Sequence, residues 1–298
     1  MSHVRAFLGA VAGTALAVLA VVGVETSGAG AGTPPDTRYV ALGDSYTAGP
    51  LIMPMNDAFV CARSARDYPA LLAARLQVQQ FTDVSCSSAT TRDFGSPQPG
   101  NVSGTNAPQY DALTRGTTLV TVGIGGNDIG LVGLAESCLN VLPAPLGKSC
   151  AARYTAGGVD VYAQKIAAFA PTYGTVIDTI RQRSPHARIV LVGYPTAIRA
   201  GGCYPVQPML GPDATYVQAK IDQLDAAMAA QAAAHGADYV DLRSSSVGHD
   251  ACALPGSRWV EGLVPLSDAF PMHPNALSMQ NAAKVIAAQL AGGGAAAG

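Results

Sequence analysis

The chain has 298 residues, of which 49% are hydrophobic and 13% charged, so it can form the core of one sizeable α/β domain or at most two. Its 18 basic and 20 acidic residues give a formal net charge of −2. This balance excludes the dense positive field of a nucleic-acid-binding protein and argues against polybasic attraction to a membrane surface.

The first 31 residues differ in composition from the rest of the chain. Arg5 provides a short positive region, residues 7–24 are almost entirely apolar or small, and Ala29-Gly30-Ala31 fits the small-x-small pattern of a signal-peptidase site. We therefore expect residues 1–31 to be a secretory signal peptide, followed by a linker over residues 32–36, and the mature protein to be secreted without stable membrane insertion. The alternative is an uncleaved anchor that keeps the protein at the cell envelope, because the apolar run approaches the length that spans a bilayer.

Predicted strands and helices alternate along the remainder of the chain. Short apolar, β-branched runs predict five strands, at residues 38–42, 81–86, 118–124, 187–193 and 237–242. Apolar residues at helical spacing predict helices at residues 68–76, 129–135, 160–182, 214–234 and 275–290. Pro171 is expected to kink the third of these helices. Residues 96–109 and 138–158 are expected to be loops, and residues 291–298 a flexible Gly/Ala tail.

This alternation is typical of one α/β domain over residues 37–290, in which helices cover both faces of a mostly parallel five-stranded sheet. In such sheets the ligand site lies outside the carboxyl ends of the strands. Polar, small-residue segments follow the first three predicted strands, at residues 43–45, 86–88 and 125–127. We therefore expect an active site at this edge of the sheet.

The segment after the first strand, Gly43-Asp44-Ser45, is a strand-to-helix turn that carries a hydroxyl group. A serine at such a turn can keep its side chain free while its backbone N–H points into the same space, which suits a nucleophile that also donates to an oxyanion. Taken alone, Gly-Asp-Ser is an ordinary turn with a helix N-cap. It also differs from the Gly-x-Ser-x-Gly elbow of the α/β-hydrolases.

Two further segments carry groups that suit the same chemistry. Gly125-Gly126-Asn127-Asp128 follows the third strand, and the amide of Asn127 can supply an oxyanion donor, although the segment is also good material for a tight turn. His273 lies in a His-Pro-Asn segment just before the last helix. Histidine is the side chain best suited to accept a serine proton near neutral pH, and the alternative is a surface histidine in a loop.

Six cysteines follow the predicted signal peptide, and an even count in an exported chain indicates three disulfides. Six cysteines allow fifteen pairings, and the sequence alone does not select one. Pairing in chain order closes the shortest loops and gives Cys61–Cys86, Cys138–Cys150 and Cys203–Cys252. Because the chain has neither a CxxC pair nor a histidine cluster, we expect no metal site.

Together and in this order, the segments around Ser45, Asn127 and His273 resemble the SGNH (GDSL-type) hydrolase family over about residues 37–290. The resemblance is closest to secreted actinobacterial lipases, esterases and phospholipases with three disulfides, and the cysteine spacing supports pairing in chain order. It implies the family's flavodoxin-like three-layer α/β/α fold. It also implies cofactor-free hydrolysis of a carboxylic ester, with Ser45 as nucleophile and oxyanion donor, His273 as general base and Asn127 as a further oxyanion donor.

The chain departs from the family pattern at two positions. Ser88 stands where the family has a glycine, two residues after Cys86, so its backbone N–H is still an oxyanion donor although serine tolerates positive φ less well. Phe270 stands three residues before His273, where the family commonly has aspartate. We expect the backbone carbonyl of Phe270 to orient the imidazole, with Asp268 as the alternative partner.

The sequence predicts the type of reaction more precisely than it predicts the substrate. Leu51, Ile52 and Met53 form an apolar, methionine-bearing stretch after the nucleophile and are expected to line an acyl-chain groove, unless they pack onto the core. A small-molecule or lipid ester is the expected partner of a monomeric protein. The alternatives are a phospholipase A, a carbohydrate O-acetylesterase and a non-catalytic cell-surface binding module.

Overall fold

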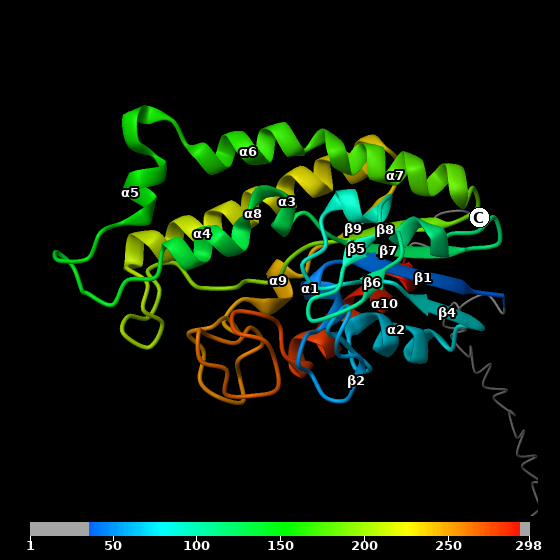
Figure 1. The fold of residues 1–298 in the computed structure, drawn as a ribbon, viewed down its shortest axis with the longest axis horizontal. Helices are drawn as coiled ribbons and strands as arrows, with labels where there is room; N and C mark the ends of the chain where they lie inside the picture. Colours follow the sequence, from blue (N-terminus) through cyan, green and yellow to red (C-terminus); the bar gives the residue numbers. More distant parts are fainter. Residues whose placement is uncertain (1–35, 293–298) are drawn as a thin grey trace, which may run out of the picture. The chain divides into compact units, whose positions relative to one another are not determined.

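The computed structural model describes residues 36–292 (Figure 1). The predicted signal peptide, almost all of the predicted linker and most of the predicted tail therefore lie outside the described residues. Among residues 36–292, none of the helices combines the length and apolar composition needed to cross a bilayer.

Five parallel strands form the central sheet, in the order β4-β1-β7-β8-β9. Counted along the chain within this sheet, the order is 2-1-3-4-5, the doubly wound order of the flavodoxin-like fold. All five strands were predicted from the sequence. Their bounds are β1 Arg38–Gly43, β4 Gln80–Asp83, β7 Leu119–Gly123, β8 Arg188–Val192 and β9 Asp238–Val240.

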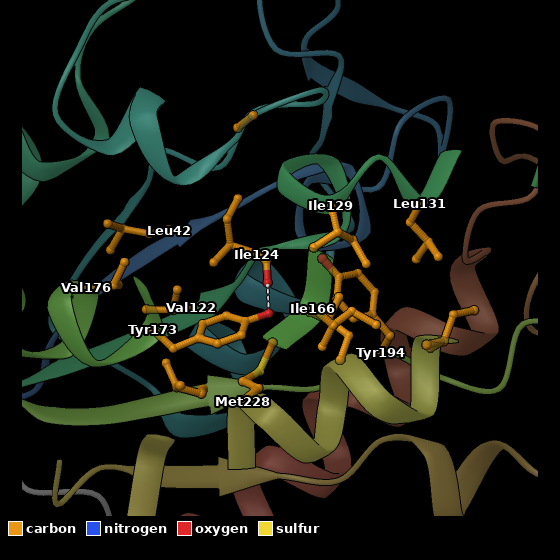
Figure 2. Packing of buried hydrophobic residues seen from close by; sticks show 14 of the residues in the cluster. Leu42, Val122, Ile124, Ile129, Leu131, Ile166, Tyr173, Val176, Tyr194 and Met228 are labelled. Atoms are coloured by element: carbon orange, nitrogen blue, oxygen red, sulfur yellow. Dashed lines mark hydrogen bonds between the residues drawn. The ribbon is translucent and has the colours of Figure 1, made fainter. Parts of the chain in front are cut away.

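Alternate residues of β1 enter two different cores, because successive side chains of a strand point to opposite faces of a sheet. Val40 and Leu42 belong to the core beneath α6 Val161–Phe169, α7 Pro171–Arg183 and α8 Gly211–Ala234. Tyr39 and Ala41 belong to the core beneath α2 Tyr68–Leu76 and α10 Ala276–Gly292. Figure 1 shows these two groups of helices on either side of the sheet, and Figure 2 shows the packing of the first core. The predicted three-layer α/β/α architecture is confirmed.

Several elements are shorter or more numerous than predicted. Pro171 divides the predicted long helix into α6 and α7, because proline cannot donate the backbone hydrogen bond that would continue the first helix. The predicted loop 138–158 contains α5 Cys150–Tyr154, and the predicted loop 96–109 contains the two-stranded ribbon of β5 Gln98–Pro99 and β6 Thr105–Asn106. Other short elements include β2 Met55–Asp57, β3 Arg63–Ser64, α3 Gly126–Ile129, α4 Leu131–Ser137 and α9 Arg243–Ser246.

Three disulfides pair the cysteines in chain order: Cys61–Cys86, Cys138–Cys150 and Cys203–Cys252. The first joins the segment after β2 to the segment after β4, and the second joins the end of α4 to α5. Each closes a loop in the unfolded chain and thereby stabilises the fold by about 2–4 kcal/mol. All three disulfides lie in segments outside the central sheet.

Candidate active site

The turn after β1 carries Ser45 as the first residue of α1 Ser45–Ala48. Asp44 caps this helix, and its Oδ1 accepts a hydrogen bond from the backbone N–H of Tyr46 at 2.8 Å. Gly43 has no room for a side chain, since a Cβ there would lie 2.2 Å from Thr47 Oγ1 and 2.7 Å from the carbonyl oxygen of Gly123. The ends of β1 and β7 therefore come close together directly beneath the serine.

The hydroxyl of Ser45 meets the imidazole of His273, which is 228 residues further along the chain. Ser45 Oγ lies 2.8 Å from His273 Nε2, and both side chains are buried. His273 Nδ1 lies 2.8 Å from the carbonyl oxygen of Pro271. A carbonyl oxygen only accepts hydrogen bonds, so it holds the proton on Nδ1 and leaves Nε2 free to accept the serine proton.

The partner of the imidazole is thus the carbonyl of Pro271, and the prediction that the Phe270 carbonyl orients His273 is wrong. The Phe270 carbonyl instead accepts the backbone N–H of His273 at 3.1 Å, in a turn where Met272 has a φ of 60°. This turn leaves the next carbonyl, that of Pro271, facing the ring. Asp268 is exposed, and within residues 36–292 it forms no hydrogen bond or ion pair with His273, whose ring nitrogens pair with Ser45 and Pro271.

Aromatic rings shield the imidazole from water. The ring of Tyr46 lies 5.1 Å from that of His273, and the ring of Phe270 packs edge-on at 5.2 Å. Burial lowers the pKa of His273 below its ordinary value of 6.5, and the hydrogen bond to Pro271 opposes this shift only in part. The imidazole is therefore neutral at pH 7, the form that a general base requires.

The predicted oxyanion donors lie on three turns that hydrogen bonds hold together. The backbone N–H of Asp44 donates to Gly123 at the end of β7, and that of Cys86 donates to Gly43. Asn127 donates through Nδ2 to the carbonyl of Ala89 at 2.9 Å, and its amide keeps a second hydrogen. Joined in this way, the three turns lie together at the carboxyl edge of the sheet.

Ser88 has the backbone conformation that a glycine would favour, with a φ of 70°. Its hydroxyl donates to Asn101 Oδ1 at 3.0 Å, and Asn101 Nδ2 donates to the carbonyl of Ser87 at 3.1 Å. Within residues 36–292, the backbone N–H groups of Ser45 and Ser88 have no acceptor. The sequence does not predict this role for Asn101, because nothing in a Gly/Ser/Asn-rich loop marks one residue as the partner of a distant turn.

Tyr194 was also missed, and its hydroxyl joins two of these turns. It donates to Asp44 Oδ2 at 2.6 Å and accepts from the backbone N–H of Gly126 at 2.8 Å. Burial raises the pKa of Asp44 to about 7, and the hydrogen bonds from Tyr194 and Tyr46 oppose that rise by favouring the carboxylate. Tyr194 follows β8, so its place after the fourth predicted strand is the signal in the sequence that marks it.

A cavity of about 150 Å³ opens beside His273. Most of its wall is apolar and comes from α4, α8 and the segment before His273, including Leu131, Ala135, Val217, Ile221, Val260 and Met272.

The residues predicted to form an acyl groove do not line this cavity. Ile52 is 1% exposed and packs in the core beside α2, whereas Leu51 and Met53 are half-exposed. The sequence did not predict this cavity, because its wall depends on the packing of helices that are distant in sequence.

No group of three or more His, Cys, Asp or Glu side chains within residues 36–292 is arranged to hold a metal ion. The second aspartate of the site region, Asp128, accepts from the backbone N–H and hydroxyl of Thr91 at 3.0 and 2.6 Å. It therefore anchors the turn that carries Asn127.

Comparison with known proteins gives concordant matches in sequence and in structure. Residues 41–280 match the model of the GDSL-like lipase/acylhydrolase family. Lipase 2 of Streptomyces coelicolor is 36% identical over 287 residues, which cover 94% of this chain and 95% of the relative. An extracellular lipase from Streptomyces rimosus superposes with a TM-score of 0.65 at 28% identity, covering 85% of this chain and 99% of the other. Phospholipase A1 from Streptomyces albidoflavus NA297 superposes with a TM-score of 0.64 at 26% identity, with the same coverage.

Proposed function

The chain belongs to the GDSL-like lipase/acylhydrolase family, and from this membership we propose that it is a secreted serine hydrolase of lipid or other acyl esters. The observation that carries the proposal is the 2.8 Å contact between Ser45 Oγ and His273 Nε2. The contact lies at the edge of the sheet where doubly wound folds bind ligands, and an apolar cavity adjoins it.

In the proposed reaction, Ser45 attacks the ester carbonyl while His273 Nε2 takes the hydroxyl proton. The backbone N–H groups of Ser45 and Ser88 and the amide of Asn127 stabilise the oxyanion. His273 then protonates the departing alcohol, and in the second half of the reaction it removes a proton from the water that releases the acid. The chemistry uses no cofactor and no metal.

A carbonyl in place of the usual aspartate has a chemical consequence for this base. The Pro271 oxygen fixes the tautomer of His273, but it stabilises the imidazolium less than a carboxylate would. It also adds no negative charge that would raise the pKa of His273. We therefore propose a Ser45–His273 dyad. Its histidine has a pKa below that of an ordinary histidine and so stays neutral to a lower pH.

The cavity beside His273 is the proposed site of the acyl chain. Its apolar wall from α4 and α8 favours a fatty acyl group over the acetyl group of a carbohydrate O-acetylesterase. Phospholipase A activity is the second candidate, supported by the structural similarity to a phospholipase A1. A non-catalytic binding module is disfavoured, because it would have no use for a serine in hydrogen-bonding contact with a neutral histidine.

The expected setting of the enzyme is extracellular. Three disulfides, a predicted signal peptide over residues 1–31 and similarity to an extracellular lipase support secretion. We further propose that the mature protein acts as a monomer on a small-molecule or lipid ester.

Labelling with a fluorophosphonate and hydrolysis of p-nitrophenyl esters test the proposal directly. Ser45→Ala is expected to abolish labelling and to reduce kcat by about 10⁶-fold, the scale of a removed nucleophile. Ser87→Ala is the matched control, because the Ser87 hydroxyl is buried nearby and has no hydrogen-bond partner within the described chain. If the wild-type protein is not labelled, or if Ser45→Ala keeps its activity, the hydrolase proposal is wrong.

Two further measurements separate the alternatives. Release of fatty acid from phosphatidylcholine identifies phospholipase A activity, and a preference for acetylated sugars identifies an acetylesterase. Asp268→Asn is expected to keep wild-type activity, whereas a loss near 10⁴-fold, typical of a removed triad acid, would replace the dyad by a triad.

A further inference from the structure

Three loops next to the cavity expose large apolar side chains to solvent. They cover residues 139–147 between α4 and α5, residues 203–210 before α8, and residues 262–267 before His273. Four side chains on these loops are between 67% and 84% exposed: Val141, Leu146, Val206 and Val264. We call these four residues the apolar rim. Exposed apolar side chains gathered in one area mark an interaction site more often than an ordinary surface.

Hydrogen bonds show that the three loops adjoin one another. The backbone N–H of Asn140 donates to the carbonyl of Pro208 at 2.6 Å, and the Tyr204 hydroxyl donates to the carbonyl of Val141 at 2.9 Å. The backbone N–H of Leu263 donates to Gln207 Oε1 at 2.9 Å. The loop at residues 203–210 thus lies between the other two and joins them into one surface.

Disulfides brace two of these loops. The first loop lies inside the ring closed by Cys138–Cys150, and the second begins at Cys203, which is bonded to Cys252. The fold therefore holds apolar side chains in water on cross-linked segments, at a cost in solvation that a bound apolar partner would remove.

The apolar rim is continuous with the cavity that reaches His273. Leu139, Met209 and Leu263, one residue from each loop, line the cavity. The side chain of Phe270, which packs against the imidazole, lines it as well. An apolar surface therefore extends from the exposed rim to the reacting groups.

The rim loops carry no charge, although 13% of the residues in the chain are charged. None of residues 139–147, 203–210 and 262–267 is Asp, Glu, Lys or Arg. Glu261, which directly precedes the third loop, is buried beside Arg258. Exposed Lys148 and exposed Asp268 directly follow the first and third loops, so the edges of this surface carry one charge of each sign and no net charge. Such a surface has little with which to attract anionic lipid or to orient a charged protein partner.

We propose that the apolar rim is a docking surface for a zwitterionic phospholipid layer. The four side chains enter the boundary between headgroups and acyl chains, so an acyl chain passes from the lipid into the cavity without crossing water. This inference rests on the proposed ester hydrolase function, since it gives that active site a route to lipid substrates. It names the surface from which the substrate is taken.

The test measures flotation of the mature protein with vesicles of pure phosphatidylcholine. All proteins carry Ser45→Ala, so that hydrolysis does not alter the vesicles. A triple variant adds Val141→Asp, Val206→Asp and Val264→Asp. The control is Val161→Asp at the start of α6, a single substitution of the same type at a 38% exposed valine outside the three loops.

The Ser45→Ala protein is expected to float with the vesicles, equally at low and high salt and without enhancement by phosphatidylserine. Each rim substitution is expected to weaken partitioning about tenfold, because burial of one valine side chain contributes at least that factor. Val161→Asp is expected to bind like the parent. Thermal unfolding of the same proteins checks their folding. In a Ser45 background, the triple variant is expected to hydrolyse a soluble short-chain ester at the wild-type rate.

Three results would overturn the docking surface: no flotation of the parent, equal flotation of the triple variant, or binding that requires anionic lipid and disappears in salt. The outcome is separable from that of the proposed function. A protein that hydrolyses soluble esters but does not float keeps its proposed function and loses the docking surface. A protein that floats through the apolar rim but hydrolyses no ester keeps the docking surface and loses its proposed function.

Discussion

The imidazole of His273 lies between two oxygen atoms, one of which accepts a hydrogen bond from the ring while the other donates one to it. The Pro271 carbonyl accepts a hydrogen bond from its Nδ1–H, and the Ser45 hydroxyl is placed to give its proton to Nε2. The sequence predicted both ends of the Ser45–His273 pair, because both residues stand beside glycine or proline turns that precede helices. It missed the oxygen behind the ring, because the choice between two adjacent carbonyls depends on the backbone angles of Met272.

The lowered pKa of His273 predicts how activity depends on pH. Because only the neutral imidazole accepts the serine proton, kcat/KM is expected to fall on the acid side at a pH below 6.5, the ordinary histidine pKa. Phe270→Ala removes a ring that shields the imidazole, so the acid limb should move towards higher pH. The pH profile of kcat/KM for a soluble ester measures both. An acid limb above 6.5 in the wild-type enzyme would contradict the neutral, desolvated base.

Tyr194 is expected to act as a positioning residue for the nucleophile and for the turn of Asn127. Tyr194→Phe removes the donor to Asp44 and the acceptor of the Gly126 N–H, so the two turns lose their shared hydroxyl. We expect kcat to fall about 10- to 100-fold with KM little changed, because small displacements of reacting groups are costly. Steady-state kinetics and the rate of fluorophosphonate labelling measure this effect.

Tyr173→Phe is the matched control for that experiment. Tyr173 is also buried, and its hydroxyl donates to the carbonyl of Ile124 at 3.0 Å (Figure 2), at the start of the turn of Asn127. Within residues 36–292, this hydroxyl forms no hydrogen bond with Asp44 or Gly126. Tyr173→Phe loses one buried hydrogen bond, worth about 1 kcal/mol of stability, and Tyr194→Phe loses two. Equal losses of kcat in the two variants would contradict a positioning role that is specific to the hydrogen bonds of Tyr194 with Asp44 and Gly126.

At the scale of elements, local patterns predicted the sheet well and the cavity poorly. The five strands are short apolar runs whose period and composition identify them without tertiary information. The cavity is different, because α4 and α8 are about 75 residues apart in the chain and meet only in the folded protein. Leu51 and Met53 belong to an apolar stretch that follows Ser45 in sequence, but they are half-exposed at the surface and do not line the cavity.

The cavity between α4 and α8 predicts a change in chain-length preference. Ala135 lies on α4 and lines the cavity, so Ala135→Phe places a ring in the space proposed for the acyl chain. We expect the hydrolysis of long-chain p-nitrophenyl esters to fall sharply while short-chain hydrolysis is kept. Leu51→Ser and Met53→Ser are the comparison and should leave the profile unchanged. If the profile follows Leu51 and Met53 and ignores Ala135, the acyl chain binds on the other side of the nucleophile.

At the scale of the whole molecule, stability is linked to a buried pair of carboxyl groups between α2 and the sheet. Asp67 caps α2 and is 1% exposed, and Asp83 ends β4. One carboxylate oxygen on each of these residues is buried and has no hydrogen-bond partner within residues 36–292. Burial, together with the neighbouring Asp83, raises the pKa of Asp67 far above its ordinary value. The pair therefore holds a proton in the folded protein at neutral pH.

This proton makes the fold less stable as the pH rises. In the unfolded chain both carboxyl groups ionise near pH 4. Above that pH the folded state therefore binds more protons than the unfolded state. The free energy of unfolding then falls by about 1.4 kcal/mol per pH unit until the folded pair ionises.

Asp67→Asn keeps the cap on Ala70 and supplies a permanent donor to Asp83. The variant is therefore expected to be more stable than the wild type at pH 8, with a gap that narrows towards pH 4. Urea unfolding at several pH values measures this gap, with Asp111→Asn on the surface as a control that should change stability by less than about 0.5 kcal/mol. A gap that stayed constant with pH, or one that favoured the wild type at pH 8, would mean that both carboxyl groups are ionised in the folded protein.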